Sequence, residues 1–172
     1  MTARFSAFEA AEEQSKEDIS NERDELHFQL FRLQQNIDEI AKKWIVIGID
    51  QRKDGYWMVL YVKDDNEQCI VMAHVCDSAF TGTWDASIHA HYCSDFHIHI
   101  DDIRGDPNHG NGSPLMRKFK SYLSEKNIHK ITGDIQARDW DHIDRLQHFY
   151  EKHSFQIELY KEEKNGTVRT SP

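Results

Sequence analysis

Two glycines separate a strand pattern from an amphipathic helix pattern, and the backbone at such a turn can bind an anion. Alternating apolar residues over 96–103 predict the strand, and the turn 110–113 reads Gly-Asn-Gly-Ser. We interpret Ser113 as the N-cap and Pro114 as the first helical residue. The first turn of a helix has unpaired N–H groups and the positive end of the helix dipole. The turn is therefore a candidate phosphate cradle.

Charged residues around this turn have opposite effects on a bound phosphate. The carboxylates of Asp101, Asp102 and Asp106 would repel it. Their repulsion must be offset by cations, for which the candidates are Arg104, Arg117, Lys118 and Lys120. The helix 114–127 carries the last three of these on its polar face.

Histidines form a second candidate chemistry on the same strand. His97, His99 and Asp101 share one face by period two, and any of them could relay a proton. An alternative is a metal site, because His89 and His91 form a second His-x-His pair and four imidazoles could bind zinc. No carboxylate or cysteine completes a standard metal spacing, and a merely polar sheet face is a further interpretation.

Composition limits the possible partners and compartment. The chain has 172 residues, a formal charge of −9 and three cysteines, Cys69, Cys76 and Cys93. The acidic balance argues against nucleic acid and anionic membranes as general partners. With no signal-peptide pattern and no closely paired cysteines, we expect a soluble cytoplasmic protein whose cysteines are buried thiols.

The N-terminal region predicts a long helix with two possible roles. Residues 8–43 contain no proline or glycine. Apolar residues follow a heptad spacing, at Leu26, Leu30, Leu33, Ile37, Ile40 and Trp44. This seam either forms a coiled-coil homodimer through residues 19–44 or packs on the chain's own sheet. Residues 1–16 are expected to fray.

The remaining pattern predicts an α+β (mixed α/β) fold. Strands over 44–50, 56–62 and 69–75 form an antiparallel meander, with a hairpin turn at Asp54-Gly55. Further strands over 87–93 and 96–103 lead to a β-α-β-α-β arrangement whose later strands are 130–135 and 155–159 and whose last helix is 141–153. We expect an N-terminal helical extension (1–43), a domain (44–162) and a flexible tail (163–172).

Three segments together resemble the GNAT superfamily, the N-acetyltransferases that use acyl-coenzyme A. They are the strand ending at Asp102-Ile103, the turn 110–113, and the segment 148–155 (HFYEKHSF). The strand end and the turn resemble the family's pyrophosphate loop, and the third segment resembles its Phe-Tyr-x-x-x-Gly-Phe helix end. Two departures stand out: Pro107 occupies the family's Arg or Gln position, and Ser154 replaces a glycine.

The resemblance implies roles for particular residues. The co-substrate is acetyl-coenzyme A, and the cofactor-binding residues are Ile103, Arg104, His109, Gly110, Asn111, Gly112 and Ser113. Tyr150 donates a proton to the departing thiolate, and His99 or Asp101 is the candidate base.

The predicted activity is direct acetyl transfer to a primary amine, on a small molecule or a peptide. The resemblance implies that this transfer proceeds without a covalent enzyme intermediate, and no base is predicted to activate Cys93. The alternative is an inactive GNAT-like module that binds coenzyme A or serves in assembly, which Pro107 and Ser154 favour.

Overall fold

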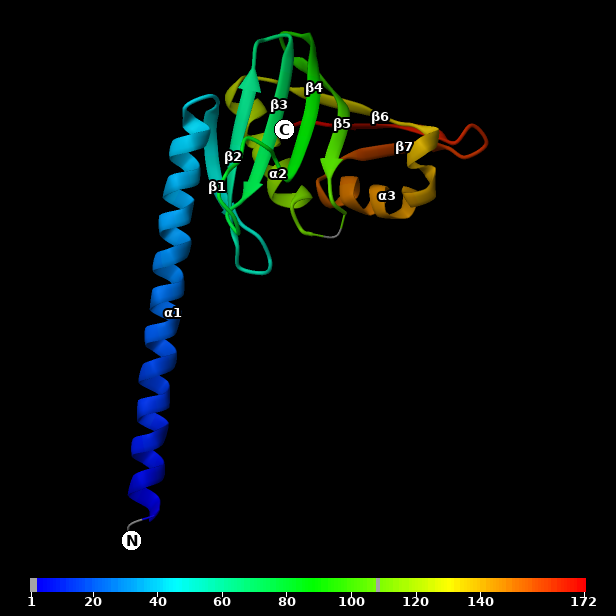
Figure 1. Ribbon diagram of the computed structural model, residues 1–172. Helices are drawn as coiled ribbons and strands as arrows, with labels where there is room; N and C mark the ends of the chain where they lie inside the picture. Colours follow the sequence, from blue (N-terminus) through cyan, green and yellow to red (C-terminus); the bar gives the residue numbers. More distant parts are fainter. Residues whose placement is uncertain (1–2, 108) are drawn as a thin grey trace.

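The computed structural model describes the backbone of residues 3–107 and 109–172, and the side chains in these ranges from residue 15 onward. A long helix precedes a sheet that carries shorter helices (Figure 1). The elements are α1 (Ala3–Ala41), β1 (Ile45–Gln51), β2 (Trp57–Asp64), β3 (Gln68–Val75), β4 (Ala86–Ser94), β5 (His97–Gly105), α2 (Gly112–Glu125), β6 (Lys130–Ile135), η1 (Ala137–His142), α3 (Ile143–Lys152), β7 (Gln156–Tyr160) and β8 (Asn165–Thr170).

The strands form one mixed sheet in the order β1-β2-β3-β4-β5-β6-β8-β7. β1 to β5 are an antiparallel meander, and α2 then crosses over to β6, which is parallel to β5. The predicted α+β class, with a meander followed by β-α-β-α-β, is confirmed. The prediction agrees with the structure because period-two alternation and the Asp-Gly turn depend only on neighbouring residues.

The two faces of the sheet are covered by different helices. On one face, the C-terminal turns of α1 bury Leu33 and Ile40 against Val59, Tyr61 and Met72. On the other face, the apolar side of α2 packs into the main core together with Tyr150 of α3. Burying a large apolar side chain contributes about 1.5–3 kcal/mol, so these contacts hold the helices on the sheet.

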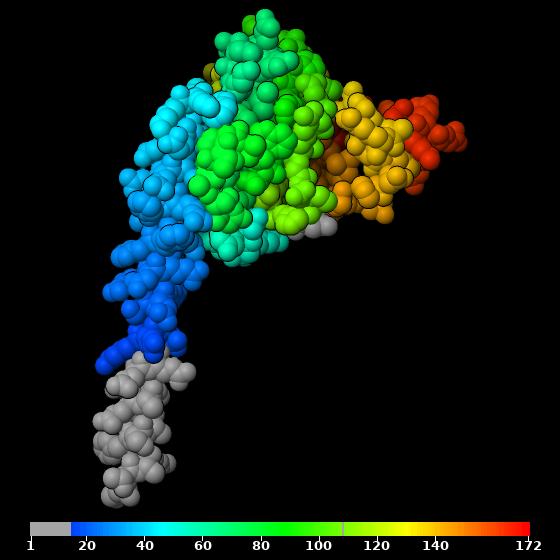
Figure 2. Space-filling model, in the orientation of Figure 1, coloured from blue at the N-terminus to red at the C-terminus, as the bar shows by residue number. Residues whose placement is uncertain are grey.

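Only part of the predicted heptad seam faces the sheet. Leu33, Ile37 and Ile40 pack on it, whereas Leu26 and Leu30 are more than half exposed. Figure 2 shows the N-terminal part of α1 leaving the globular body. The alternative in which the seam packs on the chain's own sheet is therefore confirmed for its C-terminal half, and the homodimer through 19–44 stays a prediction. α1 begins at Ala3, within the segment 1–16 that the sequence predicts to fray, and it is helical there.

The prediction of a flexible tail over 163–172 is wrong. Residues 165–170 form β8, which pairs on one side with β6 and on the other with β7. Gly166 and Val168 are its buried residues. The segment is polar, but backbone hydrogen bonds on both sides stabilise it as a strand. Among the described residues, no helix is both long and apolar enough to cross a membrane.

Candidate active site

Strands β5 and β6 diverge, and the opening between them is the centre of the candidate site. Their parallel pairing covers only His97–Ile100 of β5 and Lys130–Gly133 of β6, although β5 continues to Gly105. In Figure 2 the surface is hollowed between the end of β5 and the segment after β6, with α3 visible below. The β5 backbone from Asp101 to Gly105 therefore has groups on its β6 side that a ligand can pair with.

A β-bulge lies where the strands begin to diverge. Ala90 of β4 is opposite Ile100 and His89 is opposite Asp102, so Asp101 is the extra residue on β5. A bulge bends its strand and increases the local twist. This bend turns residues Asp102 to Gly105 away from β6, which widens the opening.

The N-terminus of α2 lies beside the end of β5 and has free amides. Gly110 has φ +80°, in the left-handed region that favours glycine. Within the described ranges, no acceptor is found for the N–H groups of Gly110, Asn111, Gly112 and Ser113. Asn108, at the start of the predicted cradle, lies outside the described residues. The available amides make this helix end a suitable anion site.

The predicted N-cap is wrong by two residues. α2 begins at Gly112, with buried Asn111 as its N-cap, so Ser113 and Pro114 lie within its first turn. The hydroxyl of Ser113 instead accepts a hydrogen bond from Lys152 Nζ at 3.0 Å and lies 3.3 Å from His153 Nε2. These contacts fasten α2 to the end of α3.

The close approach of α3 to α2 depends on Gly112. A Cβ at this position would lie 3.1 Å from Cε2 of Phe149. The aromatic ring therefore occupies the space that a larger residue at 112 would need.

Of the predicted cations, Arg104 lies beside the cradle, whereas Arg117 and Lys120 bind other partners. Arg117 pairs with Asp50 at 2.7 Å, and Lys120 donates to the carbonyl of His153 at 3.1 Å. Arg52 and Lys152, in contrast, lie at the cradle itself: Arg52 Nη1 is 3.5 Å from Oδ1 of Asn111. Both residues are distant in sequence, at the β1–β2 turn and at the end of α3, so only the fold reveals them.

A cavity of about 560 Å³ adjoins the cradle on the β3 side. Of the predicted residues, Arg104, His109 and Asn111 line it. Arg104 also donates to Asp102 at 2.8 Å. Arg52, Asp77, Trp84, Asp85, Gly105 and Asp106 complete the lining. The cavity therefore offers both charge signs and one aromatic face.

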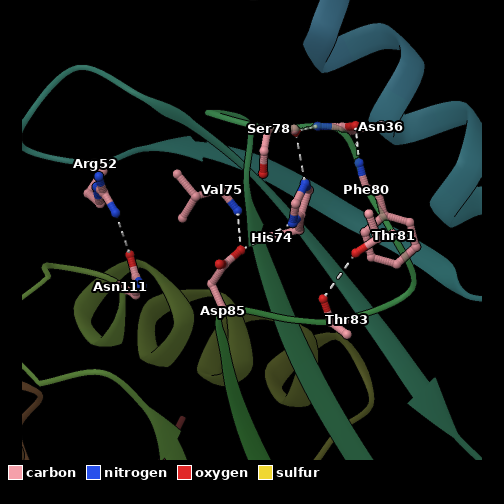
Figure 3. Close-up of polar contacts among 10 residues, drawn as sticks. All are labelled: Asn36, Arg52, His74, Val75, Ser78, Phe80, Thr81, Thr83, Asp85 and Asn111. Carbon is pink, nitrogen blue, oxygen red and sulfur yellow. Dashed lines mark hydrogen bonds and ion pairs between the residues drawn. The ribbon is translucent and has the colours of Figure 1, made fainter.

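The wall formed by Asp85 is fixed by a polar network (Figure 3). Its Oδ2 accepts from the Val75 N–H at 2.7 Å and lies 3.1 Å from His74 Nδ1. Burial raises the pKa of Asp85, but the hydrogen bonds from His74 and Val75 outweigh it and the net pKa is lowered. Asn36 of α1 binds the same loop by donating to the carbonyl of Ser78 at 3.0 Å.

Tyr150 of α3 lies in the main core between the sheet and its helices. It is 5% exposed and packs edge-on against Phe149 and Phe155. Burial raises its pKa, and the carboxylates of Asp139 and Asp102 raise it further. The phenol is therefore protonated at neutral pH and can donate.

The hydroxyl of Tyr150 is free to interact with a ligand. No described residue hydrogen-bonds to it. In the described residues every fully buried polar side-chain atom has a partner, so this hydroxyl is not fully buried. It therefore contacts accessible space.

The predicted bases, His99 and Asp101, lie on the opposite face of the sheet from Tyr150. Asp101 Oδ1 is 2.7 Å from Nδ1 of His91, a residue to which no such role was assigned from the sequence. His99 Nδ1 is 3.0 Å from Thr132 Oγ1, and its Nε2 is 3.7 Å from Asp134 Oδ2. This face can accept a proton and pass it along the strand surface.

The four-histidine metal alternative finds no support in the geometry. In the described part of the chain, no group of three or more His, Cys, Asp or Glu side chains could hold a metal ion. His89 contacts Ser87 at 3.0 Å and His97 contacts Thr132 at 2.8 Å, so the imidazoles bind separate partners. Burial lowers the pKa of both His89 and His97.

Taken together, the mixed sheet, the diverging strands and the open helix N-terminus form a GNAT-like fold. Two variants of a cAMP-binding acyltransferase from Mycobacterium smegmatis share it, with TM-scores of 0.57 and 0.58 at 9% identity. The match covers 79% of this chain and 50% of theirs. Ard1 from Thermoplasma volcanium is 22% identical, with a TM-score of 0.47 over 59% of this chain and 69% of Ard1.

At the sequence level, no protein-family model matches the chain. The uncharacterized protein YocC of Bacillus subtilis (strain 168) is 41% identical over 157 residues, which are 91% of this chain and 94% of YocC. The chain belongs to the same family as YocC.

Proposed function

We propose that the chain is an N-acyltransferase that moves an acetyl group from acetyl-coenzyme A directly to a primary amine. The observation that carries the proposal is the divergence of β5 and β6 beside the α2 N-terminus, where the amides of residues 110–113 have no acceptor among the described residues, together with a Tyr150 hydroxyl to which no described residue hydrogen-bonds. Acyl transfer from a thioester that contains a diphosphate requires an anion-binding helix N-terminus and a proton donor for the departing thiolate.

The diphosphate of coenzyme A would bind the α2 N-terminus. The N–H groups of residues 110–113 are the donors, and Lys152 and Arg52 supply positive charge. Arg52 also pairs with Asp54, so Lys152, whose partner is a neutral hydroxyl, is the less committed cation. The missing donor at Pro107 is compatible with this site, because the amides of the helix end remain available.

The thioester carbonyl would pair with the unpaired edge of β5, at the backbone of Ile103 and Arg104. An N–H aimed at a developing oxyanion contributes about 3 kcal/mol in comparable sites. The raised pKa of Tyr150 keeps its proton available for the departing thiolate. The predicted bases His99 and Asp101 lie on the opposite face of the sheet from Tyr150, so no described residue is assigned to remove the amine proton.

The acceptor is an amine of a small molecule or a peptide, and the cavity of about 560 Å³ favours a cationic one. Asp85 remains ionised through its hydrogen bonds, and it faces this cavity together with Asp77 and Asp106. A positive amine would gain energy from these carboxylates.

Calorimetry with acetyl-coenzyme A tests the first half of the proposal. We expect wild-type binding, and Lys152→Gln should weaken it about fivefold, because an exposed ion pair contributes about 1 kcal/mol. Lys130→Gln removes the same charge at the start of β6, away from the cradle, and should bind like wild type. Equal affinities in all three proteins would contradict the cradle.

A panel of amines analysed by mass spectrometry tests the second half. An acetylated product formed only with active protein supports transfer. Tight binding of acetyl-coenzyme A without transfer to any amine would instead select the inactive binding module.

A further inference from the structure

One cysteine of the chain is neither buried nor isolated. Cys93, at the end of β4, is exposed, whereas Cys69 and Cys76 are buried. The prediction of three buried thiols is therefore wrong for Cys93. Its Sγ lies 3.7 Å from Nε2 of His91, whose Nδ1 is 2.7 Å from Oδ1 of Asp101. Thiol, imidazole and carboxylate thus stand in series on one face of the sheet.

The order of these contacts fixes the role of each group. A carboxylate accepts hydrogen bonds, so Asp101 is assigned the Nδ1–H of His91. The lone pair of Nε2 then faces the thiol and can accept its proton. This arrangement supplies the base for Cys93 that the sequence did not reveal.

The surroundings leave room for a small molecule next to the sulfur. Cys93 lines a cavity of about 340 Å³, separate from the cavity at the α2 N-terminus. Lys126 and Asp95 place one cation and one anion in its lining. A small zwitterionic or polar thiol compound is compatible with this lining.

The other two cysteines cannot take part in the same chemistry. Burial raises the pKa of Cys69 to about 12 and also raises that of Cys76, so both remain protonated. They are also shielded from solvent. A disulfide formed at Cys93 with a small molecule therefore has no accessible second thiol in the described chain to displace it.

We propose that Cys93 is an activated nucleophile that exchanges with low-molecular-weight disulfides. His91 accepts the thiol proton, and the thiolate attacks one sulfur of the disulfide R–S–S–R. A Cys93–S–S–R bond forms as the original S–S bond breaks, and the leaving thiolate RS⁻ takes up the proton. Two electrons move from the protein sulfur to the leaving sulfur, so no other oxidant is needed.

This exchange is reversible by an external thiol and does not depend on acyl transfer. It also has a structural consequence for the sheet face. The modified sulfur would lie next to His91, whose ring is 5.3 Å from the ring of His99. Asp134 in turn faces His99 at 3.7 Å, so these groups set the charge around the reacting pair.

The test is the reaction of the full-length native protein with dithiobis(nitrobenzoate), an aromatic disulfide that releases a coloured thiolate. We expect one thiol to react in the native protein and none at that rate in Cys93→Ser. At about pH 6 an ordinary thiol is only about 0.3% ionised. We therefore expect His91→Gln to slow the reaction about fivefold or more at this pH, and by less at about pH 8.

Two controls distinguish a specific base from general exposure. His97→Gln changes a histidine that contacts Thr132, and it should leave the rate unchanged. Ser94→Cys in the Cys93→Ser background supplies an exposed thiol one residue along the strand, and it should react as slowly as His91→Gln. The proposal is overturned if His91→Gln matches wild type at pH 6, or if His97→Gln slows the reaction equally. Circular dichroism melting curves verify that each variant is folded.

Discussion

Replacing Tyr150 by phenylalanine removes one hydroxyl and should affect turnover without affecting the fold. The hydroxyl has no hydrogen-bond partner among the described residues, so its loss leaves no buried group unsatisfied. The ring contacts with Phe149 and Phe155 remain. We therefore expect Tyr150→Phe to melt within about 2 °C of wild type.

The effect on the rate follows from the proposed proton transfer. A positioned general acid contributes about 10²-fold to 10⁴-fold, so the turnover number should fall at least about 100-fold, or about 2.7 kcal/mol. The affinity for acetyl-coenzyme A should change by less than about twofold, since the anion-binding amides are untouched.

Tyr122→Phe is the matched control with the opposite expected result. The Tyr122 hydroxyl donates to Oδ2 of buried Asp64 at 2.8 Å. Losing a hydrogen bond to a charged group costs about 1.5–3 kcal/mol, which lowers the melting temperature by about 3–10 °C. Its turnover number should stay near that of wild type.

The assay combines calorimetric melting with the release of free thiol from acetyl-coenzyme A in the presence of an accepted amine. If Tyr150→Phe turns over like wild type but melts early, Tyr150 is a packing residue and the proton-donor role is refuted. A loss of turnover in both variants would point to a general structural effect instead.

Three further predictions concern stability and are measured by urea unfolding. Asp64→Asn should cost about 3 kcal/mol, because the ammonium of Lys126, at 2.6 Å, loses its charged partner. Burial, aided by nearby cations, lowers the pKa of His153 to about 4. Since the unfolded value is near 6.5, stability is full above pH 6.5 and falls toward pH 4; between pH 7 and pH 5 we expect a loss of about 1–2 kcal/mol that His153→Gln removes. Ser154→Gly should add about 0.5–1 kcal/mol, because Ser154 has φ +63°; an unchanged or lower stability would contradict this strain.

The sequence predicted the elements whose signals are local. The strand 130–135 has the predicted bounds, and Gly55 adopts φ +92° in the predicted hairpin turn. Ser154, which replaces the family's glycine, lies in the left-handed conformation that explains the glycine preference. In each case a few neighbouring residues determine the conformation.

Contacts between distant segments were not predictable in the same way. Arg52 and Asn111 are 59 residues apart in the chain. Lys152 and Ser113 are 39 apart. Which cations reach the cradle is decided by how β1, α2 and α3 pack, and no short pattern carries that information. His91 acquires its role in the same way: it pairs with His99 in the sheet, and its side chain reaches Asp101, the extra residue of the bulge on the neighbouring strand.

The α1 seam shows a third kind of limit. The heptad spacing correctly indicated an apolar stripe, but the stripe continues past the edge of the sheet. Leu33 is buried while Leu30, one turn earlier, is 61% exposed. The heptad pattern predicts the apolar stripe, but the extent of the sheet determines which residues of the stripe are buried.

The position of β8 makes a remote strand a structural support for the candidate active site. β7 joins the sheet only through β8, and the helix with Tyr150 is anchored between β6 and β7 in the chain. Val168 is fully buried in β8 and lies opposite Gly133 of β6, so it supports the strand that borders the opening. Substitutions there would displace Tyr150, the proposed proton donor, without changing any proposed reacting group, so a loss of activity caused by a change in the last strand need not indicate a binding residue.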